Sequence, residues 1–195
     1  MKHLRLVAGV AAVAVLTGGV FVPAAEASPT VRSDANATLT LAGGQSLSVA
    51  GNLALTVQRF EVGDDSIVVV ARLSGQLSGT LAGIPVTATF TNVRVVAAIT
   101  NLQANCAAGT LSFKYRVTVP TQGIAVTIGG VPVPLRGAVT LRGSVALSTA
   151  QIAEIDPDLA AAVGELICQI ETLLQTGASL EDVVAALNAV LANLP

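Results

Sequence analysis

The chain has 195 residues, of which 52% are hydrophobic and 11% charged, and its formal net charge is −2. This length and apolar content allow one domain with a substantial core. The weak negative balance argues against nucleic acid or anionic lipid as the main partner, because those ligands recruit basic proteins. The basic residues are also scattered along the sequence and form no cluster.

Residues 1–27 have the three parts of a secretory signal peptide. Lys2 and Arg5 give a positive start, residues 6–22 are apolar, and Ala25-Glu26-Ala27 forms a small-x-small cleavage site. A transmembrane anchor is the alternative, but the apolar run is short for one. Cleavage after Ala27 leaves residues 28–195 with 10 − 2 = 8 basic and 12 − 1 = 11 acidic residues, a net charge of −3. We therefore expect a secreted, extracellular protein without a stable membrane anchor after cleavage.

Residues 36–148 show the apolar–polar alternation of β-strands. The clearest case is 111–118, where Leu111, Phe113, Tyr115 and Val117 alternate with polar residues, so one face lies in a core and the other in water. The other predicted strands are 36–41, 46–50, 53–62, 66–74, 77–81, 85–91, 93–100, 124–128, 131–135 and 137–148. Two hairpins stand out, one turning at Gly63-Asp64-Asp65 and one at Gly129-Gly130. Pro132 and Pro134 make 131–135 an edge strand.

Strand segments spaced by about ten residues predict a mainly β fold. We expect a single secreted domain, an antiparallel β-barrel or β-sandwich of about 8–10 strands followed by a C-terminal αα-hairpin. An outer-membrane barrel is a weaker alternative. It needs aromatic girdles, and residues 28–195 contain four aromatic side chains, Phe60, Phe90, Phe113 and Tyr115.

Two helices are predicted after the strands. The first covers residues 157–176, since Asp156 is a good N-cap, Pro157 suits the first helical position and Gly177 suits the end. The second covers about 180–193, and Ser179 and Asp182 have the spacing of a capping box. Each helix carries an apolar stripe. The stripes are Leu159, Val163, Leu166, Ile167, Ile170, Leu173 and Leu174, and Leu180, Val183, Val184, Leu187, Val190, Leu191 and Leu194. We expect the second stripe to pack on the first helix and the sheet; a partner or membrane surface is the alternative.

Two cysteines in a secreted chain predict one disulfide, between Cys106 and Cys168. Two separate buried thiols are the alternative. Cys168 lies off the apolar stripe of its helix. The loop that carries Cys106 must therefore reach the flank or outer side of this helix, unless a second helix buries the outer side as well.

The sequence offers little catalytic chemistry. Its one histidine is His3, inside the predicted signal peptide, which excludes histidine-dependent nucleophiles and the usual zinc ligand sets in the mature protein. Lys114 and the turn carboxylates Asp64 and Asp65 occur in no motif that indicates a dyad or a calcium loop. We therefore expect no catalytic, cofactor-binding or metal-binding residues, and no cofactor.

The segment "LALTVQRFEVGDDSIVVVARLSGQLSG", residues 53–79, resembles the opening hairpin of a group of small secreted bacterial β-rich proteins. In that group a cysteine follows several further strands and a second one lies in a late "LLC" helix, to which Leu166-Ile167-Cys168 is similar. The resemblance extends over most of residues 53–174. It implies the β-rich fold and the disulfide, and it implies no particular activity.

Three functional hypotheses follow. The first is a non-enzymatic domain that contacts an unknown protein or polymer in or near the bacterial cell envelope. The second is a carrier of a small apolar ligand, held inside a barrel or between the sheet and the helices. Its cavity would have a few hundred Å³ and be lined by residues such as Phe60, Phe90, Phe113 and Tyr115. The third is an enzyme without histidine that uses carboxylates or serine; it predicts a cleft with two convergent carboxylates. We favour the first hypothesis and regard the carrier as its alternative.

Overall fold

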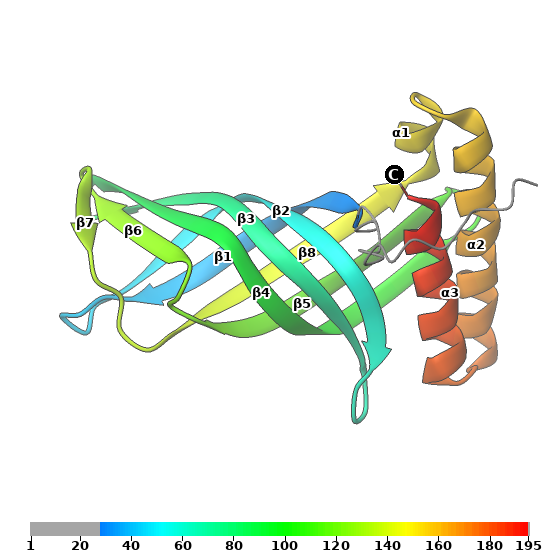
Figure 1. The fold of residues 1–195 in the computed structure, drawn as a ribbon, viewed down its shortest axis with the longest axis horizontal. Helices are drawn as coiled ribbons and strands as arrows, with labels where there is room; N and C mark the ends of the chain where they lie inside the picture. The colour runs from blue at the N-terminus through cyan, green and yellow to red at the C-terminus, as the bar shows by residue number, and fades with distance from the viewer. Residues whose placement is uncertain (1–27, 195) are drawn as a thin grey trace, which may run out of the picture.

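The computed structural model describes residues 28–194, and the predicted signal peptide lies outside this part of the chain. Strands come first and helices follow (Figure 1). The strands are β1 (Thr30–Thr40), β2 (Ser46–Val62), β3 (Ile67–Leu81), β4 (Ile84–Asn105), β5 (Thr110–Pro120), β6 (Ile124–Ile128), β7 (Val131–Val133) and β8 (Ala138–Ser148). The helices are α1 (Thr149–Ala153), α2 (Pro157–Thr176) and α3 (Leu180–Asn193).

Six of the strands close into a ring. Of the two expected architectures, barrel and sandwich, the fold is therefore the barrel. The hydrogen-bonded order is β3-β2-β1-β8-β5-β4, and β3 also pairs with β4. Every pair is antiparallel. The β6–β7 hairpin extends the wall at the end far from the helices, where β6 pairs with the first part of β4. There a bridge between Leu41 and Leu135 joins the segment after β7 to the end of β1 (Figure 1).

The alternation predicted for residues 111–118 is confirmed. Leu111, Phe113, Tyr115 and Val117 point into the barrel and are buried, while Lys114, Arg116 and Thr118 are exposed. The other ring strands bury alternate residues in the same way. The interior is therefore a packed apolar core, continuous with the buried faces of α2 and α3.

Several predicted strand boundaries are wrong, because the chain bends there and does not turn. Residues 46–50 and 53–62 form one strand, β2, and residues 66–74 and 77–81 belong to one strand, β3. Residues 85–91 and 93–100 both lie in β4, which has bulges opposite Ser74 and beyond Thr100. At the first bulge Asn92 has a positive φ of 51° and its N–H donates to Ser74 Oγ at 3.0 Å. Strand β1 also starts at Thr30, six residues before the predicted position.

The turn predictions agree with the structure. The hairpin at Gly63-Asp64-Asp65 joins β2 to β3, and Gly129-Gly130 joins β6 to β7 with φ values of 59° and 85°. Positive φ at both central residues is typical of the type I′ turns that suit two-residue hairpins. A second turn of this kind, Ala82-Gly83 with φ values of 50° and 81°, joins β3 to β4. Strand β7 is the last strand of the hydrogen-bonded order, as its prolines predict.

The helical cap, which we define as residues 149–194, covers one end of the barrel (Figure 1). Both predicted helices have the expected bounds. Asp156 accepts from the N–H groups of Asp158 and Leu159 at 3.0 Å, and Ser179 Oγ accepts from the Asp182 N–H at 3.2 Å. The middles of both apolar stripes are buried, whereas Leu174 and Leu180, next to the connecting turn, are exposed. The short helix α1 was not predicted from the sequence. No helix within residues 28–194 is both long and apolar enough to cross a membrane.

One asparagine adds hydrogen bonds between helix α3 and the barrel to their apolar contact. Strand β2 has a bulge between Val57 and Arg59, and its pairing with β1 ends at Thr56. The backbone of Phe60 therefore lacks a β1 partner. The Asn188 side chain replaces that partner, because its Oδ1 accepts from the Phe60 N–H at 2.8 Å and its Nδ2 donates to the Phe60 carbonyl at 3.0 Å.

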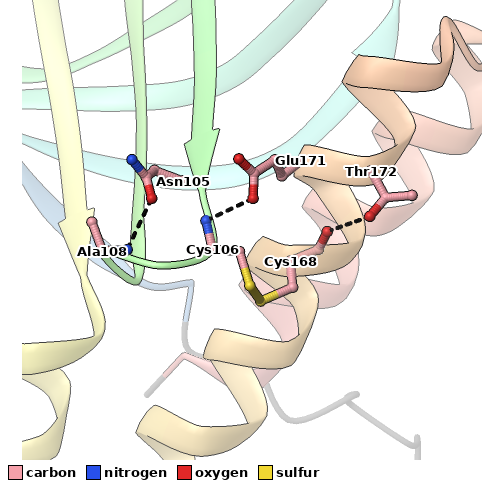
Figure 2. The surroundings of a disulfide bond; sticks show 6 residues. All are labelled: Asn105, Cys106, Ala108, Cys168, Glu171 and Thr172. Atoms are coloured by element: carbon pink, nitrogen blue, oxygen red, sulfur yellow. Dashed lines mark hydrogen bonds between the residues drawn. A yellow bond between two sulfur atoms is a disulfide. The ribbon is translucent and has the colours of Figure 1, made fainter.

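Helix α2 is attached by the disulfide between Cys106, in the β4–β5 turn, and Cys168 (Figure 2). The turn reaches the flank of the helix, the first arrangement expected from the position of Cys168. Beside the disulfide, Glu171 Oε2 accepts from the Cys106 N–H at 2.9 Å, and Asn105 Oδ1 accepts from the Ala108 N–H at 2.9 Å. The Glu171 hydrogen bond thus joins the turn to α2 next to the disulfide, and the Asn105 hydrogen bond closes the turn itself.

Candidate functional site

An open groove of about 710 Å³ crosses the outer wall of the barrel. Its lining comes from five strands that lie side by side, β2, β1, β8, β5 and β4. We call it the outer-wall groove; its lining residues are Asp34, Ala35, Asn36, Ala50, Gly51, Asn52, Thr100, Lys114, Tyr115, Arg116, Arg142, Gly143 and Ser144. The volume falls within the range of about 300–1,000 Å³ that is usual for ligand sites.

The floor of the groove is a row of residues in direct cross-strand register. Gly51 is opposite Ala35, Ala35 is opposite Gly143, and Gly143 is opposite Tyr115. Ala35 and Tyr115 point into the barrel and are 5% and 2% exposed. Gly51 and Gly143 have no side chain and Ala35 has a small one, so few side-chain atoms separate the wall from the interior here. We attribute the hollow on the outside to this row.

Tyr115 fills the inside of the barrel beneath the groove. A Cβ built on Gly143 would lie 2.5 Å from the Tyr115 Cζ, so the ring occupies the space that a side chain at 143 would need. The Tyr115 hydroxyl is 2.8 Å from Ser33 Oγ, a hydrogen bond that satisfies both buried groups. Burial raises the pKa of Tyr115, and the Ser33 hydrogen bond lowers it by a smaller amount. The phenol is therefore neutral and has a structural role.

The rim of the groove carries three cationic side chains. Arg116 and Arg142 are directly opposite each other on β5 and β8, and Lys114 is two residues from Arg116 on the same face. All three are exposed. Like charges directly opposite on neighbouring strands destabilise a sheet. Within residues 28–194, the one ion pair joins Arg59 to Glu61 on β2, so no carboxylate forms an ion pair with the rim cations.

The part of the groove formed by β1 and β2 is polar. Asp34 and Asn36 project from β1, and Asn52 projects from β2. Asn36 is in register with Arg142, and Asp34 is in register with both Ser144 and Asn52. The groove thus has cations on its β8–β5 side and amide and carboxylate groups on its β1–β2 side. This set can bind an anion and can hydrogen-bond to polar groups next to it.

Charge is also segregated over the whole fold. Residues 28–148, which include all the strands, contain 8 basic and 4 acidic residues, whereas residues 149–194 contain 7 acidic residues and no basic residue. The barrel therefore has a net charge of +4 and the helical cap −7. The scattered basic residues of the sequence become a cationic surface because the sheet brings β5 next to β8.

The four aromatic residues predicted to line a ligand cavity are all buried, but they do not form one site. Phe60 and Phe113 make an edge-to-face pair at 5.9 Å near the helical cap. The space lined by this pair and by residues such as Leu187 and Val190 is about 30 Å³, the share of a single water molecule. Phe90 is not part of this space. It lies in the part of β4 remote from Cys106, in register with Gly75 and Ile124. The Tyr115 hydroxyl is instead hydrogen-bonded to Ser33.

The acidic residues form no metal site, since no three His, Cys, Asp or Glu side chains of residues 28–194 lie close enough together to hold an ion. The rim of the groove was not predicted from the sequence. The alternation of 111–118 places Lys114 and Arg116 on one outer face, but only the register of β5 with β8 adds Arg142. No protein-family model, curated protein or solved structure matches the chain.

Proposed function

We propose that this protein is a non-enzymatic secreted β-domain that contacts a polymer or protein in or near the bacterial cell envelope through its outer-wall groove. The observation that carries the proposal is the Arg116–Arg142 pair, two cations in direct register on the rim of a 710 Å³ groove. A protein that keeps such a pair without an internal carboxylate partner gains stability when an anion binds there.

Other features support the proposal. The sequence of residues 28–195 contains no histidine, and the groove holds a single carboxylate, that of Asp34, whereas glycosidic hydrolysis requires two. The disulfide suits an oxidising compartment outside the cytoplasm. We also propose that the chain belongs to the group of small secreted bacterial β-rich proteins that it resembles.

The carrier of an apolar ligand is the alternative proposal. It requires an apolar cavity of a few hundred Å³. The space between Phe60, Phe113 and α3 is about 30 Å³, and a mostly apolar hollow of about 200 Å³ lies where Val31 and Leu147 of the barrel meet Ile152 of the helical cap. The outer-wall groove is larger, about 710 Å³, but carries charged side chains. We favour the contact function because the largest of these three spaces is the charged one.

The test is cosedimentation of the purified mature protein with a cell-envelope fraction from the bacterium that makes it. Replacing both rim arginines, Arg116→Ala with Arg142→Ala, should abolish binding. The fold offers a matched control, because Arg72 and Arg94 are also exposed and directly opposite each other, on β3 and β4, outside the groove. Arg72→Ala with Arg94→Ala makes the same change in net charge and should leave binding intact. Equal binding by both double variants would refute a role for the groove.

A further inference from the structure

We infer that the outer-wall groove binds an acidic polysaccharide, a chain of sugar units that bear carboxylate or phosphate groups; the inference rests on the contact function proposed above. It assigns the acidic groups to the Arg116–Arg142 side of the groove and the sugar hydroxyls to the Asp34–Asn36–Asn52 side. Each side has an independent structural reason.

The cationic side matches the shape of an acidic group. Directly opposite residues of an antiparallel pair have Cβ atoms about 4.5–5.5 Å apart, so the guanidinium groups of Arg116 and Arg142 can converge on one anion. Guanidinium groups bind carboxylate and phosphate oxygens in a two-pronged geometry. Lys114, two residues along β5 on the same face, lies across the floor from Arg116 and adds a third cation to this part of the groove.

The polar side matches hydroxyl groups. Asn36 and Asn52 each carry a donor and an acceptor, and the Asp34 carboxylate accepts from hydroxyls. A carboxylate beside the groove repels a partner that is acidic along its whole length, such as a polyglutamate segment. The same carboxylate can hydrogen-bond to a chain in which acidic groups alternate with hydroxyls. The mixture of three cations with Asp34 and two amides therefore favours a polysaccharide over an acidic peptide.

The dimensions of the groove suit a linear polymer. Its lining crosses five neighbouring strands, and four strand spacings of about 4.8 Å amount to roughly 19 Å along the wall. The groove is open on the outer face of the barrel, since its lining side chains such as Asn52, Thr100 and Arg142 are exposed. A chain can therefore lie across the wall and continue past both ends, so no free chain end is required.

The experiment measures binding of defined probes to the mature protein by isothermal titration calorimetry at fixed salt. The probes are oligogalacturonate for carboxylated sugar, a glycerol-phosphate oligomer with attached sugars for phosphorylated sugar, maltooligosaccharide for neutral sugar, and oligoglutamate for an acidic peptide. We expect one of the two acidic sugars to bind, and the neutral sugar and the peptide to bind at least about tenfold more weakly. Which acidic sugar binds identifies the source of the charge.

Two sets of variants separate the sides of the groove. Arg116→Ala with Arg142→Ala should weaken acidic-sugar binding about tenfold or more, and Arg72→Ala with Arg94→Ala should leave it unchanged. Asn36→Ala with Asn52→Ala should weaken the binding of the acidic sugar by a similar factor. The same variant should have no effect on any residual binding of oligoglutamate. Thermal unfolding of each variant in the absence of probe establishes that the barrel is intact, since all these side chains are exposed.

The outcomes distinguish this inference from the contact function. If envelope binding depends on Arg116 and Arg142 but oligoglutamate binds as well as either acidic sugar, the polysaccharide is wrong and an acidic protein segment is the partner. If no acidic sugar binds while envelope binding still depends on the two arginines, the ligand class is likewise wrong and the contact function stands. If envelope binding is insensitive to the arginines, the contact function at this groove fails as well.

Discussion

Removal of the disulfide should cost about 4 kcal/mol of unfolding free energy. Cys106 and Cys168 are 62 residues apart. Closing a loop of that size lowers the entropy of the unfolded chain by about 14 cal/mol/K in the chain-entropy model, which is about 4 kcal/mol at 25 °C. This is a large part of the roughly 5–15 kcal/mol that stabilises an ordinary domain.

The suitable variant is Cys106→Ala with Cys168→Ala, because it leaves no free thiol. Cys106 is exposed, so the substitution there removes little buried surface, and the hydrogen bond from the Cys106 backbone N–H to Glu171 remains available to alanine. Most of the loss should therefore arise in the unfolded state. In urea unfolding followed by circular dichroism, we expect a lower midpoint and a larger dependence on urea, because the unlinked chain exposes more surface.

Wild-type protein reduced with dithiothreitol is the control. It should unfold at the same urea concentration as the double variant, since both lack the cross-link. A double variant within about 1 kcal/mol of the oxidised wild type would refute the loop-closure account. A reduced wild type that matched the oxidised protein, with only the variant destabilised, would assign the effect to the alanines.

Three further predictions concern single side chains. Tyr115 is the chain's one tyrosine, and burial raises its pKa, so ultraviolet titration should show it ionising above the ordinary value near 10. Its contribution to stability should be complete below pH 10 and fall as the pH rises through the folded-state pKa; ionisation at or below pH 10 would contradict this. Asn188→Leu leaves the Phe60 N–H and carbonyl without their side-chain partner and should cost about 2–3 kcal/mol in urea unfolding, whereas Asn193→Leu, which loses a bond within its own helix, should cost under about 1 kcal/mol. Ala82 has a φ of 50° in a two-residue turn, so Ala82→Asn should raise stability by about 1 kcal/mol; an unchanged or lower melting temperature would argue against strain at this residue.

The features predicted correctly from the sequence depend on neighbours within a few residues. The bounds of α2 follow from Asp156, Pro157 and Gly177, whose capping preferences are local. The buried face of β5 follows from the alternation of its own residues. Burial of the second stripe follows from its composition, although Leu180 at its start is exposed.

The errors arise where tertiary pairing overrides a local signal. Predicted strands end next to Gly51 and Gly75, but both glycines lie within strands that continue because neighbouring strands pair with them. The rim of the groove depends on the pairing of β5 with β8, which no local pattern specifies. The position of Phe90 apart from the Phe60–Phe113 pair likewise depends on strand pairing, since Phe90 is opposite Gly75 of β3 and Ile124 of β6.

The closure of the ring has a consequence for how the chain folds. Strand β1 can pair with β2 soon after both are synthesised. Its other edge stays unpaired until β8 has been synthesised, because that edge pairs with β8, for example Ser33 with Val145. Contacts between residues so distant in sequence slow folding, and an unpaired edge invites association with other chains. Cys168 follows β8 in the chain, so its native partner Cys106 comes within reach late in synthesis. Refolding of the reduced chain should therefore be slow and concentration-sensitive, with oxidation following closure of the barrel.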